Sequence, residues 1–470
     1  MRIVNPATDE VLREVAADDA AAIAAKLAKA RATQPAWART PLVERQAVLG
    51  RFRALVAARI EPLAQTLTQE VGKPIAQSRR ELTALLDRIE WFVAHVPAVL
   101  ADEVVHREAG LEERIRREPL GVVANVSAWN YPWFVGASVF VPALLTGNAV
   151  LYKPSELATL TGLEIAGLLR EAGVPEGVFT AVPGDGAAGQ ALVAQRVDGV
   201  FFTGSYATGA RIAAAVAPRM VRLQLELGGK DPVYVCEDVD PAAVAAAVAD
   251  GAFYNTGQSC CAVERIYVRR GVWEPFLDAF VSTVRGFRVG DPLDDATYIG
   301  PLARRAPQIE LLERQVADAV AKGARVLLGG TRVDRPGHFF APTVLVDVDH
   351  RMQVMREESF GPLIGLMPVA DDEDGRREEV AGAVDAAPAR QHARPARDGV
   401  GDLRVEMRDR GVTPGERADV RLLVQRITDD EAAHGRDERV HERGPDALVN
   451  VDALDRAAAL ASVVERSVSE

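Results

Sequence analysis

The sequence predicts an α/β protein with a parallel β-sheet in its middle third. From residue 119 onward, short apolar runs alternate with helical segments, a pattern typical of a parallel sheet with helices on both faces. A second set of the same kind begins near residue 231. Ligands of such sheets bind at the carboxyl ends of the strands, so the polar residues that follow each strand are the first candidates for function.

Length, charge and cysteine use restrict the class further. The chain has 470 residues, enough for two or three domains, and a formal net charge of -12. That charge argues against nucleic acid or an anionic membrane as a partner, because phosphate binding needs clustered Lys and Arg. No apolar run has the length of a signal peptide core or a membrane span, so we expect a cytoplasmic protein. Its three cysteines, Cys236, Cys260 and Cys261, have no disulfide or metal spacing, so we expect reduced thiols and no metal.

The first hundred residues are predicted to be helical. Stretches at 18–36, 42–71 and 76–94 carry apolar residues three and four positions apart. Gly72-Lys73-Pro74 marks a stop between the last two. Residues 103–118 then alternate polar and apolar residues about Gly110, which predicts an exposed hairpin of the kind that contacts a partner subunit.

The βα alternation can be assigned element by element. Strands are expected within GVVANVSAWN, NAVLYKP, FTAVPG, DGVFFTGS and VRLQLELGG, with helices at 159–172 and 206–217. The second set consists of a strand in DPVYVCEDVD, an Ala-rich helix at 241–253 and a strand in ERIYVRR.

The stretch GAFYNTGQSCCAVE at 251–264 contains the strongest candidate for covalent chemistry. Cys260 follows a Gly-Gln loop whose backbone amides could hold an oxyanion, although a free Cys is often only a small buried residue. A thiol of ordinary pKa, about 8.5, needs a base to act as a nucleophile at neutral pH. Glu226 in LELGGKDP is the candidate base, because apolar neighbours are expected to desolvate it and raise its pKa; a solvated strand-end carboxylate is the alternative. Asn130 in SAWNYPW can donate to an oxyanion, or can be a structural turn residue.

Two further stretches suggest a nucleotide site. FFTGSYATG at 201–209 leads from a strand into a helix, and free amides at a helix start favour phosphate, although an ordinary strand-to-helix turn explains the residues equally well. In YKPSE, Lys153 and Glu156 follow another strand, where the hydroxyls of a bound adenosine would lie; a surface ion pair is the alternative.

Taken in order, the motifs AWNYP, YKPSE, FTGSxxxG, ELGGKDP, FYNTGQSCC and EESFGP resemble the NAD(P)-dependent aldehyde dehydrogenase superfamily from about residue 3 to residue 370. The resemblance implies that Cys260 is the nucleophile, Asn130 the oxyanion donor and Glu226 the general base, with Cys261 a buried neighbour. It implies cofactor contacts at Trp129, Lys153, Glu156, Gly204, Ser205, Gly209, Glu358 and Phe360. A glutamate at the position of Glu156 favours NAD over NADP, whose 2'-phosphate would meet a carboxylate.

The same resemblance implies the domain plan. A Rossmann-like cofactor domain is expected at 1–102 and 119–229, with an oligomerisation hairpin at 103–118. An α/β catalytic domain, incomplete at its end, is expected at 230–374. The implied substrate is a small-molecule aldehyde, and the implied assembly is a homo-oligomer.

The last hundred residues depart from the family pattern. Residues 371–470 contain no Phe, Trp, Tyr or Lys, and the YGL, GxVxxN and PFGGxKxSG segments of the family are missing. We interpret 375–470 as an irregular or disordered tail read in a shifted frame; a divergent extension is the alternative. A tail of this kind lacks the strand that joins subunits, so an inactive relative that keeps only cofactor-binding residues is the second functional reading. Acyl transfer to coenzyme A is the third, and Glu226 speaks against it.

Overall fold

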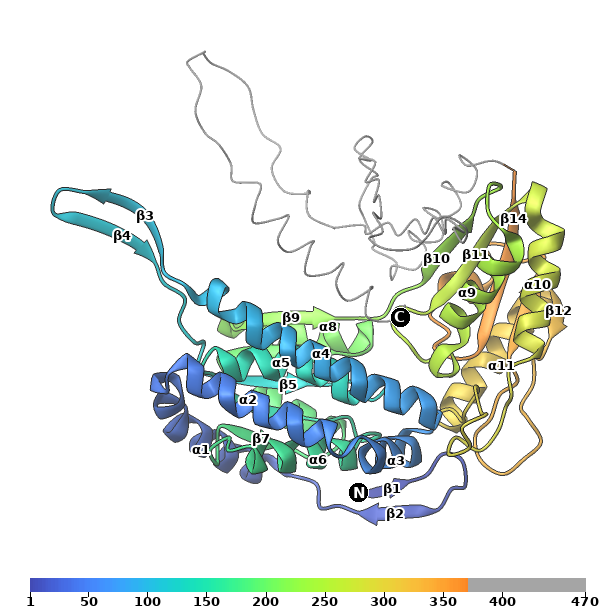
Figure 1. Ribbon diagram of the computed structural model, residues 1–470. Helices are drawn as coiled ribbons and strands as arrows, with labels where there is room; N and C mark the ends of the chain where they lie inside the picture. The colour runs from blue at the N-terminus through green and yellow to red at the C-terminus, as the bar shows by residue number, and fades with distance from the viewer. Residues whose placement is uncertain (371–470) are drawn as a thin grey trace. The chain divides into compact units, whose positions relative to one another are not determined.

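The computed structural model describes residues 1–370, which form two five-stranded sheets and two separate hairpins (Figure 1). The predicted α/β fold class is confirmed for this part of the chain. The irregular tail and the frame change predicted at 375–470 lie outside the described residues. No helix within the described part is apolar over a length that could cross a bilayer.

The first sheet is wholly parallel and lies in the order β7-β6-β5-β8-β9. The chain forms β5, β6 and β7 outward from the centre, then returns to the other side of β5 for β8 and β9. The strand order therefore reverses at β5, and ligands of parallel sheets generally bind beyond the carboxyl ends of the strands at such a point. The strand bounds are β5 Val122–Val126, β6 Ala149–Lys153, β7 Phe179–Ala181, β8 Gly199–Thr203 and β9 Arg222–Glu226.

Helices cover both faces of this sheet because its strands are apolar on both sides. Val123 and Tyr152 belong to one buried cluster and Ala124 and Leu151 to another, as expected when successive side chains point to opposite faces. The first cluster is completed by α2 Leu42–Ala57, α3 Ile60–Val71, α4 Ile75–Leu100, α5 Pro132–Leu145 and α6 Thr159–Glu171. The second is completed by α1 Ala20–Arg39, α7 Gly186–Ala194 and α8 Tyr206–Val216, which a 3-10 turn at Ala217–Arg219 follows.

The second sheet has the order β10-β11-β14-β13-β12 and is parallel except for β12 (Figure 1). Its strands are β10 Asp231–Val235, β11 Val263–Arg269, β12 Arg325–Leu328, β13 Thr343–Val346 and β14 Leu363–Val369. Helices α9 Pro241–Phe253 and α10 Trp273–Arg285 pack on one face, and α11 Ala306–Ala321 and α12 Gln353–Arg356 on the other. Two 3-10 turns, Tyr254–Gly257 and Arg270–Val272, follow α9 and β11.

Three details of the N-terminal region test the sequence reasoning. The hairpin is confirmed as β3 Glu103–Glu108 and β4 Leu111–Ile115, with Gly110 left-handed at φ 87°. The single helix predicted at 42–71 is wrong: the chain turns after Ala57, and Pro62 lies in the first turn of α3, where its missing N–H costs no hydrogen bond. The short pair β1 Arg2–Val4 and β2 Val11–Glu14 was not predicted.

Candidate active site

The loop before Cys260 is strained and tightly held. Asn255, Thr256 and Gly257 are all left-handed, with φ values of 54°, 60° and 70°, and each non-glycine residue in this conformation costs about 1–2 kcal/mol. The Asn255 Nδ2 donates to the Gln258 carbonyl at 3.0 Å, and the Gln258 Nε2 donates back to the Asn255 carbonyl at 3.2 Å. The Thr256 hydroxyl accepts the amide of Gly300 at 2.9 Å. Strain maintained in this way is typical of a functional loop.

Cys260 emerges from this loop with an exposed side chain. Cys261 is exposed as well, so the expectation that it is a buried neighbour is wrong; Ala262 takes the buried position before β11 instead. A hydrogen bond with the Cys261 thiol raises the pKa of the Cys260 thiol above its usual value. The accessible Cys260 thiol therefore needs a base, or an added positive charge, to become a thiolate.

Asn130 lies against the same loop. Its side chain is buried, and its Nδ2 donates to the Gln258 carbonyl at 3.1 Å, two residues before Cys260. The Asn130 carbonyl accepts the Asn255 Nδ2 at 3.2 Å, so the loop after β5 and the loop after α9 hold each other. An amide nitrogen carries two N–H groups, and the bond to Gln258 uses one of them. The other N–H takes no part in that bond.

Glu226 ends β9, and its side chain is exposed. The expectation that apolar neighbours desolvate it is wrong, because β9 is an edge strand on which Leu223 and Leu225 turn inward while Gln224 and Glu226 turn outward. Its Oε1 accepts the Gln224 Nε2 at 3.1 Å. The turn that follows Glu226 nevertheless approaches the nucleophile loop, since a Cβ added to Gly229 would lie 3.8 Å from the Cys260 carbonyl oxygen.

Glu358 packs on that same turn. A Cβ on Gly228 would lie 2.4 Å from the Glu358 Oε1, and the Gly229 amide donates to the Glu358 carboxylate. Burial, together with the negative charge of Glu264, raises the pKa of Glu358 to about 7. Two residues further on, the Phe360 ring meets the Trp129 ring edge to face, with centroids 5.5 Å apart. The structure thus brings Glu358 to the turn beside the Cys260 loop, and Phe360 to Trp129, the residue before Asn130.

The remaining predicted cofactor residues lie at the ends of β6 and β8. Lys153 ends β6 with its side chain 5% exposed, 3.6 Å from the Glu156 carboxylate, and burial lowers the pKa of its ammonium group. Ser205 is the N-cap of α8, and Gly204 precedes it. Gly209 has a packing role, since a Cβ there would lie 2.6 Å from the Leu227 side chain.

A sequence profile of the Aldehyde dehydrogenase family matches residues 1–379. The chain belongs to the aldehyde dehydrogenase family. It is 37% identical over 374 residues to a betaine aldehyde dehydrogenase from Cereibacter sphaeroides, a match that covers 79% of this chain and 77% of that protein. The predicted family resemblance is therefore confirmed.

Solved structures agree with the assignment to the aldehyde dehydrogenase family. A succinate-semialdehyde dehydrogenase from Burkholderia pseudomallei is 34% identical with a TM-score of 0.78, covering 80% of this chain and 78% of that one. An indole-3-acetaldehyde dehydrogenase complexed with NAD+ is 32% identical with a TM-score of 0.78 and the same coverage.

Sequence reasoning missed a set of buried polar residues on α4 that bind both loops of the site, the one that carries Asn130 and the one before Cys260. The Glu81 Oε1 accepts the amides of Trp133 at 2.9 Å and Phe134 at 3.2 Å, where α5 starts just after Asn130. Its other oxygen pairs with the buried Lys73 ammonium group, and the Gln77 Oε1 accepts the Asn255 amide at 2.8 Å. Gln77 and Glu81 lie four residues apart, on one helix face, and this spacing is the only feature of the local sequence that could have indicated a shared buried role. Within residues 1–370, no group of His, Cys, Asp and Glu side chains is arranged to hold a metal ion.

Proposed function

We propose that this member of the family oxidises a small-molecule aldehyde to a carboxylic acid through a covalent intermediate on Cys260, with NAD as the hydride acceptor. The observation that carries the proposal is the Asn130 amide, held at 3.1 Å from the Gln258 carbonyl on the loop that presents the exposed Cys260. A nucleophile and a neutral hydrogen-bond donor on adjoining loops are the two groups that acyl chemistry needs first.

Glu226 accepts the proton of the Cys260 thiol and releases it to solvent, and the resulting thiolate attacks the aldehyde carbon, whose carbonyl oxygen becomes an oxyanion. The second N–H of Asn130 and the backbone N–H of Cys260 stabilise this charge. Loss of hydride from the same carbon leaves a thioester on Cys260. Glu226 accepts a proton from a water molecule, which hydrolyses the thioester and frees the thiolate. The exposed position of Glu226 gives it access to that water.

The residues present fit NAD as the cofactor. The Ser205 side chain makes no cap hydrogen bond to α8, so the first amides of this 11-residue helix remain open to a phosphate. Lys153 and Glu156 would hold the adenosine hydroxyls, and the half-exposed Glu156 carboxylate would repel the 2'-phosphate of NADP. Trp129, Glu358 and Phe360 would hold the nicotinamide half, while Gly204 and Gly209 allow the strand-to-helix turn to approach closely. When bound, NAD takes up the hydride that the aldehyde carbon releases.

The hairpin β3–β4 is the proposed contact with a second subunit. Its apolar side chains Val104, Val105, Leu111 and Ile115 are each more than 40% exposed. Light scattering on the purified chain measures the oligomeric state directly.

The test is NADH formation by the purified chain with a panel of aldehydes that includes betaine aldehyde, succinate semialdehyde and indole-3-acetaldehyde. We expect absorbance from NADH with at least one aldehyde, a lower rate with NADP, and no change when coenzyme A is added. A folded protein that forms no NADH with any aldehyde would contradict the proposal.

A non-catalytic relative that keeps only cofactor binding is the second candidate. Two observations favour it: the family match ends at residue 379, and no Phe, Trp or Tyr follows Phe360. Fluorescence titration with NADH separates the two candidates, because binding without turnover is expected only of the second.

A further inference from the structure

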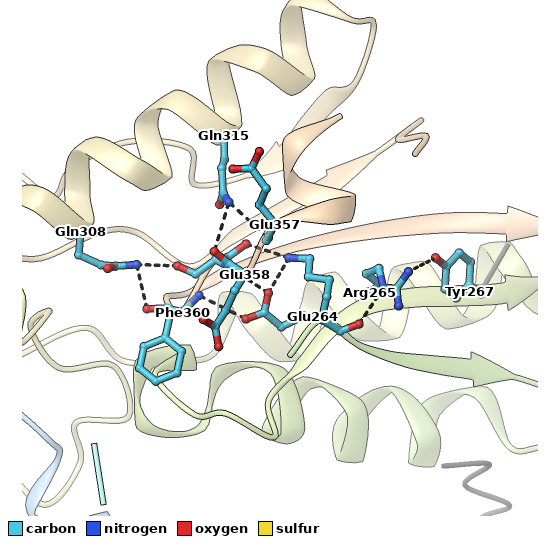
Figure 2. Close-up of polar contacts among 10 residues, drawn as sticks. Glu264, Arg265, Tyr267, Gln308, Gln315, Glu357, Glu358 and Phe360 are labelled. Carbon is cyan, nitrogen blue, oxygen red and sulfur yellow. Dashed lines mark hydrogen bonds and ion pairs between the residues drawn. The ribbon is translucent and has the colours of Figure 1, made fainter. Parts of the chain in front are cut away.

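The segment Glu357–Phe360 links the end of α12 to the start of β14 and pairs with no strand. It carries Glu358 and Phe360, two of the residues proposed to hold the cofactor. The N–H and C=O groups of a buried segment outside a ladder must find hydrogen-bond partners elsewhere, or they are left unpaired. In this chain the Glu357 amide donates to the Gln353 carbonyl, and most other partners of the segment are buried side chains (Figure 2).

One carboxylate binds the amides of the segment. The Glu264 Oε2 accepts the Ser359 amide at 2.9 Å, and its Oε1 accepts the Phe360 amide at 3.3 Å. Phe360 is left-handed at φ 48°, a conformation that a bulky residue avoids unless its surroundings impose it. The Glu264 carboxylate therefore fixes the backbone that aims the Phe360 ring at Trp129.

One ammonium group completes this arrangement. The Lys230 Nζ donates to the Glu264 Oε2 at 2.5 Å and to the Ser359 hydroxyl at 3.1 Å. The side chains of Lys230 and Glu264 are only 2% and 6% exposed. A buried pair is costly to bring out of water and leaves an uncompensated charge if either partner is removed, so it holds its neighbours firmly only while it is intact.

Two glutamines bind the carbonyls from α11. The Gln308 Nε2 donates to the carbonyls of Ser359 at 2.6 Å and Phe360 at 3.2 Å. The Gln315 Nε2 approaches those of Glu357 at 3.4 Å and Glu358 at 3.5 Å. Figure 2 shows both glutamines and Glu264 converging on the segment.

Lys230 also joins the segment to the rest of the site. It follows directly on Gly228-Gly229, the turn on which the Glu358 carboxylate packs, and its own carbonyl accepts the Arg265 Nε at 2.9 Å beside Glu264. Lys230 therefore contacts the segment through its side chain and adjoins, through its main chain, the turn on which Glu358 packs.

We propose that Lys230 and Glu264 are positioning residues for the cofactor: their buried pair fixes the Glu358–Phe360 segment against the Gly228-Gly229 turn. The proposal rests on the proposed function, since the segment is taken to contact NAD. A pair with a purely structural role would lower thermal stability without separating cofactor binding from aldehyde binding.

The experiment uses the full chain with Lys230→Met and Glu264→Gln, both of nearly unchanged size. We expect the dissociation constant for NADH, measured by fluorescence, to rise about tenfold or more, which corresponds to about 1.4 kcal/mol. The KM for the aldehyde at saturating NAD should stay within about twofold, since cofactor contacts are the ones lost. Lys230→Arg keeps the charge and should recover part of the affinity.

Val284→Ala is the control, because Val284 is buried in the α10 cluster of the same sheet and makes no part of the segment's network. It should lower the melting temperature and leave NADH affinity unchanged. Hydrogen exchange measures the protection of the segment's own amides. The amides of Ser359 and Phe360 should lose protection in Lys230→Met and keep it in Val284→Ala.

The outcomes separate the proposal from the proposed function. Unchanged NADH affinity together with unchanged exchange in Lys230→Met would overturn the positioning role, as would an equal loss in Val284→Ala. If the wild-type chain neither binds NADH nor turns over, the proposed function fails, while the exchange comparison still decides whether the pair fixes the segment. Should Lys230→Met fail to fold, Ser359→Ala removes only the hydroxyl contact and is expected to weaken NADH binding by about threefold, against no change if the proposal is wrong.

Discussion

Gly257→Ala tests whether the left-handed loop before Cys260 sets the geometry of the site. Gly257 has a φ of 70°, and an added Cβ would lie 2.3 Å from the backbone oxygen of Gly361. Ordinary contacts begin at 3.4 Å, so the loop and the Gly361 backbone must separate by about 1 Å. The left-handed conformation costs alanine a further 1–2 kcal/mol, approximately. The added Cβ is fixed to the Gly257 backbone and the Gly361 oxygen belongs to the main chain, so no side-chain rotation relieves the contact.

A displacement of about 1 Å at reacting groups lowers rates by about 10²-fold. We therefore expect Gly257→Ala to lower kcat about 10²-fold in the NADH assay and to lower the melting temperature. Gly50→Ala is the matched control: Gly50 lies in α2, has no left-handed φ, and an added Cβ meets nothing within 4 Å. This control should keep full activity and gain slight stability, because alanine favours helix. Wild-type kcat in Gly257→Ala would refute the reasoning.

Three further predictions concern side chains at the site. Cys260→Ala should abolish turnover while Cys261→Ala keeps most of it; equal losses in the two rates would exclude the assigned roles. Asn130→Ala should lower kcat about 10²- to 10³-fold if its amide holds the oxyanion, whereas a loss below about tenfold would indicate a structural turn. Because the pKa of Glu358 is raised to about 7, its carboxylate is charged above that pH and protonated below it, so the KM for NAD should rise as pH falls from about 8 to about 6. Glu358→Gln should flatten this pH dependence, and a variant that retains it would contradict the role.

The five strands of the first sheet, and β10 and β11 of the second, could be predicted from the sequence because buried parallel strands form continuous apolar runs bounded by Gly, Pro and helix patterns. The β5 and β6 runs of GVVANV and NAVLYK are examples, and both lie where expected. The other three strands of the second sheet, β12, β13 and β14, were not predicted. The break between α2 and α3 was missed because Ala58 and Arg59 suit a helix as well as a turn. Pro62, in the first turn of α3, was the sequence signal overlooked, and Leu63 and Leu67 of α3 pack in the same cluster as α2.

The position of the site at the strand ends was also predictable, while the exposure of single side chains was not. Leu223 and Leu225 precede Glu226 in the sequence yet turn to the opposite face, which the letters LQLE alone do not disclose. The buried polar network was missed for a different reason. Lys230, Glu264 and Ser359 are separated by 34 and 95 positions, and a Lys or a Glu is normally exposed unless such a distant partner exists.

The central claim is that Cys260 carries the acyl group between oxidation and hydrolysis. Its most direct test is mass spectrometry of the chain mixed with NAD and an aldehyde and quenched with acid within the first turnover, because the thioester exists only between oxidation and hydrolysis. The tryptic peptide 231–265 carries all three cysteines, so fragmentation identifies the modified one. The account predicts an acyl adduct on Cys260 together with about one NADH formed per chain. An adduct on Cys261, or NADH formed with no adduct on any cysteine during the burst, would contradict it.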